Sequence, residues 1–345
     1  MMRLATSTCL FIGLTLAGAG AQTPPVPRDQ QYLFIDAQTA RSRLTRMINL
    51  STVRDRLMGA ADKGYGVAFV AGSSSSANLL LRRGGPGPGS YRMVASSREG
   101  AFLDELNQAA SQGFRVVPES IKALDESGGF GNQTTWLAVL VKQSDTSRIK
   151  YSVVKGTKDG EEALAHSSTA GRAVVGILGR QGMAAANTLL FFADSNEAVP
   201  PVSEQREYRI VATARTSALQ NDLTAAAAEG FRVIGAGFGD MTVLMARERG
   251  STPAPVEYRV IAMIRTETAV KELQAAGAEG FRVAAISEHG PEGVFILHRR
   301  PGSSDRFEYR LAGLNEATAS QSLVDAEADG YRIIRLLSDL VVLER

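Results

Sequence analysis

A short pattern of apolar, small and aromatic residues recurs six times along the chain. In each copy a Leu precedes a Gly by seven residues; in most copies an Ala follows the Leu by three residues and an aromatic residue directly follows the Gly. The six pairs are Leu57/Gly64, Leu106/Gly113, Leu164/Gly171, Leu223/Gly230, Leu273/Gly280 and Leu323/Gly330. Leu and Ala three residues apart share one helix face, and a Gly just past the last turn adopts the left-handed conformation without Cβ strain. Each copy therefore predicts a short amphipathic helix that ends at its glycine.

Three strand-like segments accompany each predicted helix, and they are of two kinds. The segments before and directly after the helix alternate apolar and polar residues, as in Tyr208–Ile210 and Phe231–Val233. The last segment is apolar almost throughout, as in Val294–Leu297. Alternation indicates a half-buried strand, whereas continuous apolarity indicates a strand that is buried on both faces. We therefore expect the third strand in the centre of each sheet, in the order 2-3-1.

These elements predict an α+β protein of six tandem βαββ repeats, each similar to half of a ferredoxin-like fold. One face of each sheet would be covered by its own helix, and the other face would need a further cover. Since so small a unit buries little apolar surface alone, we predict that the units pack in pairs, sheet against sheet. A continuous stack of sheets is the alternative.

Spacing and linker composition place the repeats along the chain. We predict a signal peptide at 1–21, a Pro-rich leader at 22–30, repeats at 31–83, 90–143, 149–193, 207–249, 256–300 and 307–345, and linkers at 84–89 and 194–206. The third repeat is the most degenerate, because Arg172 replaces its cap aromatic, and the second has a long connection at 118–135. Thr216, Thr266 and Asn315 lie where helices should begin and are candidate N-caps.

The first residues have the composition of a secretory signal. Arg3 supplies a positive charge, Leu10–Leu16 is an apolar run, and Ala19–Ala21 provides the small residues of a cleavage site before Gln22. The single cysteine, Cys9, lies inside this segment, so the mature chain would have no disulfide and no thiolate chemistry. We expect an exported protein, periplasmic or extracellular, without a membrane span, because no later apolar run approaches ~18 residues.

Charge and aromatic content narrow the choice of partners. The formal net charge of the 345 residues is +2, and aromatic residues make up 6% of them. Binding to nucleic acid requires a concentrated basic face. The composition therefore gives no support to a nucleic-acid partner.

The last three repeats resemble a known family. The segments E-Y-R-V, A-E-G-F-R-V and V-F-I-L-H-R-R of repeat 256–300 resemble a small bacterial domain of unknown function. Members of that family read E-Y-K-V-V, a short helix, G-x-E-G-W-E-V-V and a closing apolar strand that ends in Lys or Arg. This chain has Phe or Tyr where the family has Trp, and Arg where it often has Glu. The resemblance implies tandem degenerate βαββ units and brings no catalytic residue with it.

Candidate catalytic and metal-binding residues are few. The histidines are His166, His289 and His298, and the last two belong to one predicted hairpin, where Glu288 or Glu292 could complete a metal or general-base site. No H-E-x-x-H, G-x-S-x-G or Walker-type motif is present. Surface histidines are the simpler interpretation, so we predict no catalytic constellation, no metal site and no cofactor.

Arginine is the one polar residue that the repeats share. One arginine follows the first-strand Tyr and another follows the cap aromatic. The candidate ligand-binding residues are Arg209, Arg232, Arg259, Arg282, Arg310 and Arg332, with Arg92 and Arg115 at equivalent positions. By alternation we expect these side chains to point away from the helix. The structural interpretation is that they pair with acids at the rim of an interface; the functional one is a strip that binds carboxylate, phosphate or sulfate.

The sequence predicts an architecture more sharply than an activity. A non-enzymatic, exported repeat scaffold that binds another protein or an envelope component fits the repeated units and the missing catalytic motifs. The alternative is a periplasmic protein that binds a small ligand or an anion through the strand arginines. An enzyme built on Glu288, His289 and His298 is the third hypothesis. The identity of the partner and the oligomeric state are left open.

Overall fold

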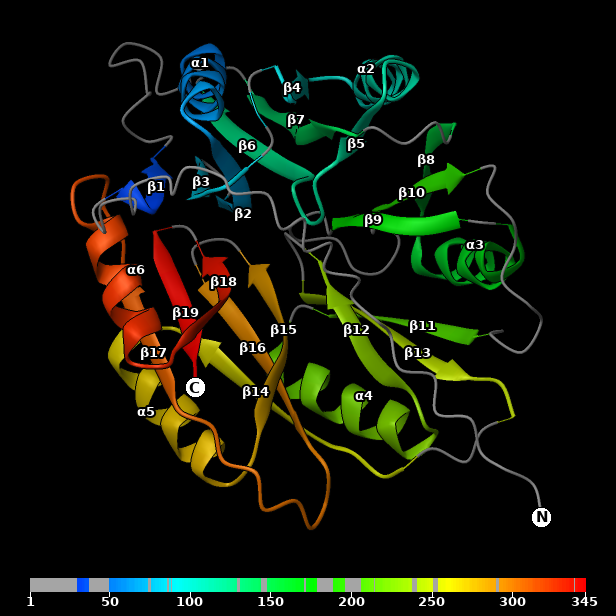
Figure 1. Ribbon diagram of the computed structural model, residues 1–345. Coiled ribbons are helices and arrows are strands. Elements are labelled where there is room, and N and C mark those ends of the chain that lie inside the picture. Colours follow the sequence, from blue (N-terminus) through cyan, green and yellow to red (C-terminus); the bar gives the residue numbers. More distant parts are fainter. Residues whose placement is uncertain are drawn as a thin grey trace, which may run out of the picture.

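Six similar units follow one another along the chain. The computed structural model describes residues 30–36, 50–73, 76–85, 87, 89–128, 131–143, 148–170, 172–178, 189–195, 206–213, 215–237, 241–250, 254–289, 292–337 and 339–345. We number the units 1 to 6 in chain order. Figure 1 shows their helices spaced around the periphery of the molecule, with the strands directed toward its middle.

Each unit contributes one helix, and the helices end as the glycine pattern predicts. They are α1 (Leu50–Asp62), α2 (Glu99–Ser111), α3 (Thr157–Ala170), α4 (Thr216–Ala228), α5 (Thr266–Ala278) and α6 (Ala319–Ala328). The left-handed conformation is confirmed for five cap glycines, with φ between 81° and 95°: Gly64, Gly113, Gly230, Gly280 and Gly330. The sixth, Gly171, lies outside the described residues.

The helix starts differ from the prediction. Thr216 and Thr266 are the first helical residues rather than N-caps, and the residues before them, Arg215 and Arg265, make no side-chain capping bond. Asn315 does cap a turn, because its Oδ1 accepts from the backbone N–H of Thr318 at 2.9 Å. The threonine prediction is therefore wrong by one residue. Asn315 caps the turn that precedes α6, whose own N-cap is Thr318.

The sheets confirm the predicted fold class and strand order. From edge to edge, the sheets of units 1 and 2 contain β1 (Tyr32–Ile35), β3 (Ser76–Arg83) and β2 (Tyr65–Ser73), and β4 (Tyr91–Ser96), β7 (Gly131–Lys142) and β5 (Phe114–Val116). Those of units 3 and 4 contain β8 (Ile149–Lys155), β10 (Leu189–Ser195) and β9 (Arg172–Leu178), and β11 (Arg206–Thr213), β13 (Met241–Glu248) and β12 (Arg232–Ala236). Those of units 5 and 6 contain β14 (Glu257–Met263), β16 (Glu292–Arg299) and β15 (Arg282–His289), and β17 (Tyr309–Gly313), β19 (Leu340–Glu344) and β18 (Arg332–Leu337). The third strand of each unit is central and antiparallel to both neighbours, so its apolar run is buried on both faces.

The two faces of a central strand pack against two different helices. In unit 5, Phe295 and Leu297 of β16 lie in the cluster around α5, whereas Val294 and Ile296 lie in the cluster around α4 of the preceding unit. Alternate side chains of a strand point to opposite faces. Each sheet is therefore held between its own helix and the helix of the unit before it.

This packing continues around the molecule and closes it. Helices α1 to α5 pack on the first strands β4, β8, β11, β14 and β17 of the following units, and α6 packs on β1 of unit 1. The predicted packing in pairs, sheet against sheet, is wrong: every unit contacts the unit before it and the unit after it. The reason is that the second face of each sheet is covered by a helix, which leaves no bare sheet face for pairing.

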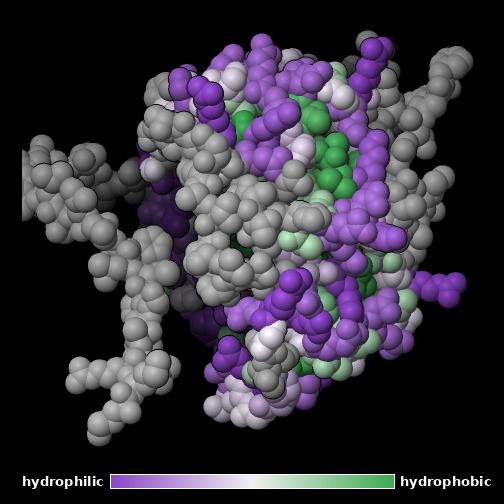
Figure 2. All heavy atoms as spheres, turned by 90° about the vertical axis from the view of Figure 1, so that its right-hand side faces the viewer, coloured by the Kyte–Doolittle hydropathy of each residue, from purple (hydrophilic) through white to green (hydrophobic). Residues whose placement is uncertain are grey.

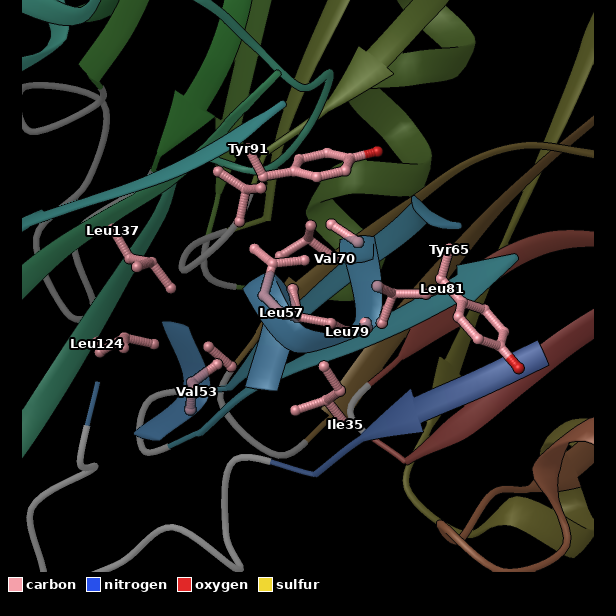
Figure 3. Close-up of a cluster of buried hydrophobic side chains, with 14 residues drawn as sticks. Ile35, Val53, Leu57, Tyr65, Val70, Leu79, Leu81, Tyr91, Leu124 and Leu137 are labelled. Atoms are coloured by element: carbon pink, nitrogen blue, oxygen red, sulfur yellow. The ribbon is translucent and has the colours of Figure 1, made fainter. Parts of the chain in front are cut away.

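Ring closure buries residues that are far apart in the sequence. Tyr32 and Leu80 of unit 1 share a cluster with Leu323 of unit 6. The backbone N–H of Tyr32 donates to Ser320 Oγ at 2.9 Å, and the Tyr32 hydroxyl donates to Glu327 at 2.5 Å. The neighbouring cluster between units 1 and 2 has the same arrangement, with Leu57 of α1 among strand residues of both units (Figure 3). The closing junction thus repeats the contacts of an internal junction.

A bulge four residues after the cap glycine interrupts the second strand. The register shifts at Ala68, Val175, Ile234, Ala284 and Ile334. The first-strand Tyr of the next unit reaches this point: the hydroxyls of Tyr91 and Tyr258 accept from the N–H groups of Val67 and Val233 at 2.9 and 2.8 Å. A buried N–H beside a bulge needs such a partner, so the tyrosines join consecutive units.

Unit 2 replaces the bulge with a longer excursion. The predicted long connection at 118–135 is not a loop throughout, because β6 (Lys122–Gly128) pairs with β7 and continues the line of β5. Val116 pairs with Leu140 and Lys122 pairs with Leu137, so the five residues 117–121 lie where other units have one bulged and two paired residues. This excursion places Glu119 toward the centre of the ring.

Helix side chains also bond the first strand of the next unit. Gln220 of α4 donates to the carbonyl of Tyr258 at 2.9 Å and accepts from the N–H of Val260 at 2.8 Å. Asn107 of α2 makes the same two bonds to the backbone of Tyr151, at 3.1 and 2.7 Å. A first strand lies at the edge of its sheet, so these amides cover backbone groups that would otherwise stay open.

One side of the ring is mainly hydrophilic. Figure 2 shows the side of the ring that lies on the right in Figure 1, where hydrophilic side chains dominate and hydrophobic areas are small among the coloured residues. None of the helices in the described ranges has the length and apolarity that a membrane span requires.

Candidate functional site

The first-strand arginines are bound to their own helices. Arg209 makes two hydrogen bonds to Glu229, at 2.8 and 2.6 Å, and Arg259 makes the same pair to Glu279, at 2.9 and 2.6 Å. Both glutamates are helix C-cap residues, and these hydrogen bonds hold their pKa values below the usual range. Arg310 lies 3.9 Å from Asp329. The expectation that these side chains point away from the helix is wrong, because the neighbouring Tyr faces the preceding helix instead.

A second arginine completes each helix end. Arg247, near the end of β13, donates to the carbonyl of Glu229 at 2.8 Å, and Arg299 of β16 donates to the carbonyl of Glu279 at 3.2 Å. The cap aromatic lies between the two guanidinium groups: the Phe281 ring centre is 4.3 Å from Arg259 and 4.5 Å from Arg299. Carbonyls at a helix end lack partners within the helix. These arginines therefore have a structural role.

The second-strand arginines have different neighbours. Arg332 and Arg282 both bind Glu344 of β19, with the Nε atoms of both guanidinium groups 3.1 Å from Glu344 Oε1. The Tyr309 hydroxyl lies 3.3 Å from the other carboxylate oxygen, and the Glu344 side chain is only 3% exposed. Burial and this carboxylate raise the pKa of Tyr309. At the junction of units 5 and 6, two arginines from consecutive units thus hold one buried carboxylate.

Unit 5 has a histidine where unit 6 has this carboxylate. In the strand registers, His298 pairs with Tyr258 and Arg282, just as Glu344 pairs with Tyr309 and Arg332. Burial lowers the pKa of His298, and the charges of Arg300 and Arg232 lower it further, while Glu344 opposes them. The imidazole is therefore neutral at pH 7. The junction of units 4 and 5 repeats the arginines of the next junction without its carboxylate.

A groove opens at this junction. Its volume is about 670 Å³. We call it the arginine groove and define it by Arg232, Arg247, Arg282, His298, Arg299 and Arg300. Arg247 and Arg299 are paired with Glu207 and Glu257, each at 2.5 Å. The described contacts of Arg232 are with the carbonyl oxygens of Phe231 and Ala254. Two carboxylates, Glu248 and Asp305, also line the groove. Arg282 is bound to Glu344, so Arg232 and Arg300 are the guanidinium groups of the groove without a described carboxylate partner.

The structure separates the histidines of the third hypothesis. His289 pairs with Glu292 at one end of β15 and β16, whereas His298 lies six residues further along β16. At about 3.4 Å per residue, the two histidines are roughly 20 Å apart. The side chains of His166, Glu288, His289 and Glu292 lie outside the described residues. Among the residues that were described, no group of three or more potential ligands could hold a metal ion.

Sequence reasoning found some members of the groove and missed others. Arg232 and Arg282 were candidates, and the structure brings them together. Arg209, Arg259 and Arg310 lie at the helix ends, and Arg332 belongs to the Glu344 site. The sequence offered His298 as a metal ligand or general base, with a surface histidine as the simpler interpretation, and Arg300 was not singled out. An alignment of the last three repeats could have identified the groove. It places Ala246, His298 and Glu344 at one position, so that the carboxylate of unit 6 has no counterpart in units 4 and 5.

Comparisons of the chain with protein-family models and with curated proteins found no match.

Proposed function

We propose that this chain is an exported, non-enzymatic binding protein that holds an acidic segment of a partner protein in the arginine groove. The ring supplies a rigid frame, because each unit is fixed by a helix on both faces of its sheet. The groove supplies the recognition, because guanidinium groups bind carboxylates through directed, charge-assisted hydrogen bonds.

The single observation that carries this proposal is the Glu344 site. There the protein binds one of its own carboxylates with Arg282, Arg332 and Tyr309. The equivalent groups one junction earlier are Arg232, Arg282 and Tyr258, and they surround a neutral histidine. A carboxylate from outside would complete this arrangement. The Tyr258 hydroxyl accepts from Val233 N–H and retains a proton that it can donate.

The size of the groove favours a peptide over a small anion. A single carboxylate fills only a small part of about 670 Å³. Side chains such as Phe307 and Val256 line the remainder, and they offer apolar contact to the neighbouring residues of a bound segment. A small ligand or anion bound by the strand arginines remains the second candidate function, and the experiment below separates the two.

The test is binding of a fluorescein-labelled hexaglutamate peptide, followed by fluorescence anisotropy at low and high salt. His298→Glu reproduces the carboxylate of unit 6, so it should fold normally and weaken binding by at least about tenfold, which is 1.4 kcal/mol. Arg232→Ala should weaken binding similarly. Arg265→Ala is the matched control, because Arg265 lies at the start of α5, at the opposite end of the helix from the groove.

Two results would contradict the proposal. If His298→Glu binds the peptide as tightly as the unaltered chain does, the groove is not the peptide-binding site. Equal affinity for glutarate and for the peptide would show that a small anion suffices, and it would replace the protein partner with the second candidate. The reverse change, Glu344→His, should open an equivalent site between units 5 and 6 and raise the peptide stoichiometry.

Export has its own test. The proposed signal segment, residues 1–21, lies outside the described residues, and the support for it is the sequence alone. N-terminal sequencing of the protein from its native cell should give Gln22 as the first residue. A chain that retains Met1 would overturn the export proposal and leave the groove proposal untouched.

A further inference from the structure

A cavity lies where units 2, 3 and 4 meet near the centre of the ring. Its volume is about 440 Å³. It is lined by the second strands of these units, with Ile121, Val174, Ile177 and Ile234 among the apolar residues, and by Arg335 from unit 6. We call it the central cavity. It adjoins the arginine groove, because Ile234 lines both. The other residues of the groove come from the linker end of units 4 and 5.

The cavity forms beside the most degenerate unit. Tyr208, which lines it, is only half-buried, whereas the other five first-strand tyrosines are buried: Tyr32, Tyr91, Tyr151, Tyr258 and Tyr309. In unit 3 the residue after the cap glycine is Arg172 rather than an aromatic residue. The junction between units 3 and 4 is therefore less completely filled than the other junctions.

Every charged group of the cavity comes from a departure from the repeat. Arg335 is the fifth residue after its cap glycine, where the other units have Phe69, Pro118, Gly176, Gly235 and Ala285. Glu119 comes from the excursion that replaces the bulge in unit 2, and Lys122 is the first residue of β6, which follows this excursion. The other five units have an apolar or small residue at the position of Arg335. A charged residue at this position is therefore not needed to form the ring.

Arg335 and Glu119 form an ion pair across the ring. The Arg335 side chain is 15% exposed and Glu119 is 56% exposed, so the carboxylate lies at the solvent side of the cavity. Burial lowers the pKa of Arg335 to about 10, which leaves the guanidinium charged at neutral pH. Glu119 has a φ of 60°, and it is the only described residue other than glycine with a positive φ. Such strain persists where the surroundings hold a residue in place and is concentrated at binding sites.

The cavity also exposes apolar surface. Ile234, the bulged residue of unit 4, lines it and is 50% exposed; only one other large apolar residue among those described, Ile264, is comparably open. The cavity therefore combines an exposed apolar side chain, Ile234, with the charged group of Arg335. A ligand that covered Ile234 and bound Arg335 would satisfy both.

We propose that the central cavity binds a small amphipathic carboxylate, whose carboxylate replaces Glu119 on Arg335 and whose apolar body packs on Ile234 and the neighbouring second strands. The volume falls within the range of about 300–1,000 Å³ that is typical of small-molecule pockets, and such pockets combine an apolar lining with a few polar groups. The positive charge of Arg335 selects an anion. The charged residues of this site, Arg335 and Glu119, do not belong to the arginine groove, although Ile234 lines both.

The test is calorimetric titration of decanoate into the mature chain, residues 22–345. Ile234→Ser should weaken binding by at least about tenfold, while the matched control Ile264→Ser, which removes the other exposed isoleucine, should leave it unchanged. Arg335→Met should weaken decanoate binding and leave the binding of the uncharged decanol as it was. Glu119→Gln should strengthen decanoate binding, because it removes the competing carboxylate.

These variants also separate a binding role from a structural one. Glu119→Gln alters only the competitor, so tighter binding cannot arise from damage to the fold. If Arg335→Met fails to fold, the decanoate affinities of Ile234→Ser and Glu119→Gln still test whether the central cavity binds the carboxylate. Decanoate affinity that is the same in Ile234→Ser and Glu119→Gln as in the unaltered chain would overturn the proposal. His298→Glu, which blocks the arginine groove, should not change decanoate binding, and a loss there would place the fatty acid in the groove instead.

Discussion

The first-strand tyrosine carries out two tasks with one side chain. Its ring fills the space between a helix and the next sheet, and its hydroxyl meets the N–H group that the bulge frees. Tyr151 and Tyr309 show the second task at other junctions, where they accept from Val116 and Val283 at 2.8 and 3.0 Å. A phenol supplies both a large apolar surface and an oxygen at its end that can accept from an N–H, which an indole cannot do.

The contribution of this hydroxyl can be measured. Tyr91→Phe leaves the Val67 N–H without its partner, and we expect the free energy of unfolding to fall by about 1–3 kcal/mol. Tyr208→Phe is the control, because the half-buried Tyr208 lies where water can take over its bonds, and a change within about 0.5 kcal/mol is expected. Urea denaturation of both variants measures the difference. Equal losses would show that the hydroxyl bond has no special role.

His298 predicts a dependence of stability on pH. Its pKa is lowered in the folded protein, so the unfolded chain binds more protons as the solution becomes acidic. The stability associated with a neutral His298 is complete above the ordinary histidine pKa of about 6.5, and it is lost as pH falls through the lowered value. His298→Gln should flatten this part of the profile between pH 7.5 and 5, as measured by urea denaturation. A profile that is the same with and without His298 would contradict the assignment.

At the scale of single residues, the sequence predicted positions better than directions. The six glycines marked helix ends because only one residue type suits a left-handed cap. The repeated arginines were visible too, but their direction was not. Alternation implies that neighbours such as Tyr208 and Arg209 lie on opposite faces of the sheet. It does not reveal which face is covered by the unit's own helix and which by the helix of the preceding unit.

Among the elements, the edge strands are held by side chains of the preceding helix. The two bonds from Gln220 to β14 show how: one amide both donates to a carbonyl and accepts from an N–H. In unit 3 a carboxylate serves instead, since Glu161 accepts from the N–H of Ile210 at 2.7 Å. In α3 and α4 the bonding residue lies three positions before the helix leucine, whereas in α2 and α5 it lies one position after it, as Asn107 and Gln274.

Removing this amide tests the importance of the edge contact. Gln220→Ala loses two hydrogen bonds, so we expect the free energy of unfolding to fall by about 1–3 kcal/mol. Asp222→Ala, on the exposed side of the same helix, should change it by no more than about 0.5 kcal/mol. Thermal and urea unfolding provide the comparison. If Gln220→Ala were as stable as the control, the bonds to β14 would be dispensable.

The order of elements within a unit followed from local patterns, but the contacts between units did not. The apolar run of β16 showed that both of its faces are buried, and the structure confirms this. The run cannot state whether a sheet or a helix provides the cover, because both present similar apolar side chains. The arginine groove was only partly predictable. Arg232 and Arg282 recur at one position of the repeat, so the sequence pointed to them. The absence of a carboxylate at His298 becomes visible only when units 4, 5 and 6 are compared.

The whole molecule is a closed ring, and closure removes the ends that an open array of repeats must protect. In an open stack, the apolar face of α6 and the edge of β1 would both face water. Here each covers the other, and the ion pair between Arg56 and Glu316 at 2.6 Å adds to the contact. The central cavity also depends on closure, because Arg335 of unit 6 reaches it from across the ring.

Circular permutation tests closure directly. A chain in which residue 345 is joined to residue 30 by a linker as long as residues 249–256, and which is opened within residues 84–89, moves the ends from one junction to another. Because the junctions are equivalent, we expect a monomer whose melting temperature lies within a few degrees of the natural order. Size-exclusion chromatography with light scattering and thermal unfolding measure both. An aggregated permutant would indicate that the contact of α6 with β1 does not close the ring in solution.

The contact between β1 and α6 also sets the order in which the protein is completed during synthesis. Tyr32 and Ser320 are separated by 288 positions in the chain. At about 5–20 residues per second, the first strand leaves the ribosome roughly 15–60 s before the helix that covers it. Units 2 to 5 can assemble on their predecessors as they emerge, but unit 1 has to wait for the last unit. Until translation ends, each nascent chain has one uncovered strand edge, and a factor that shields the N-terminal segment would act during this interval.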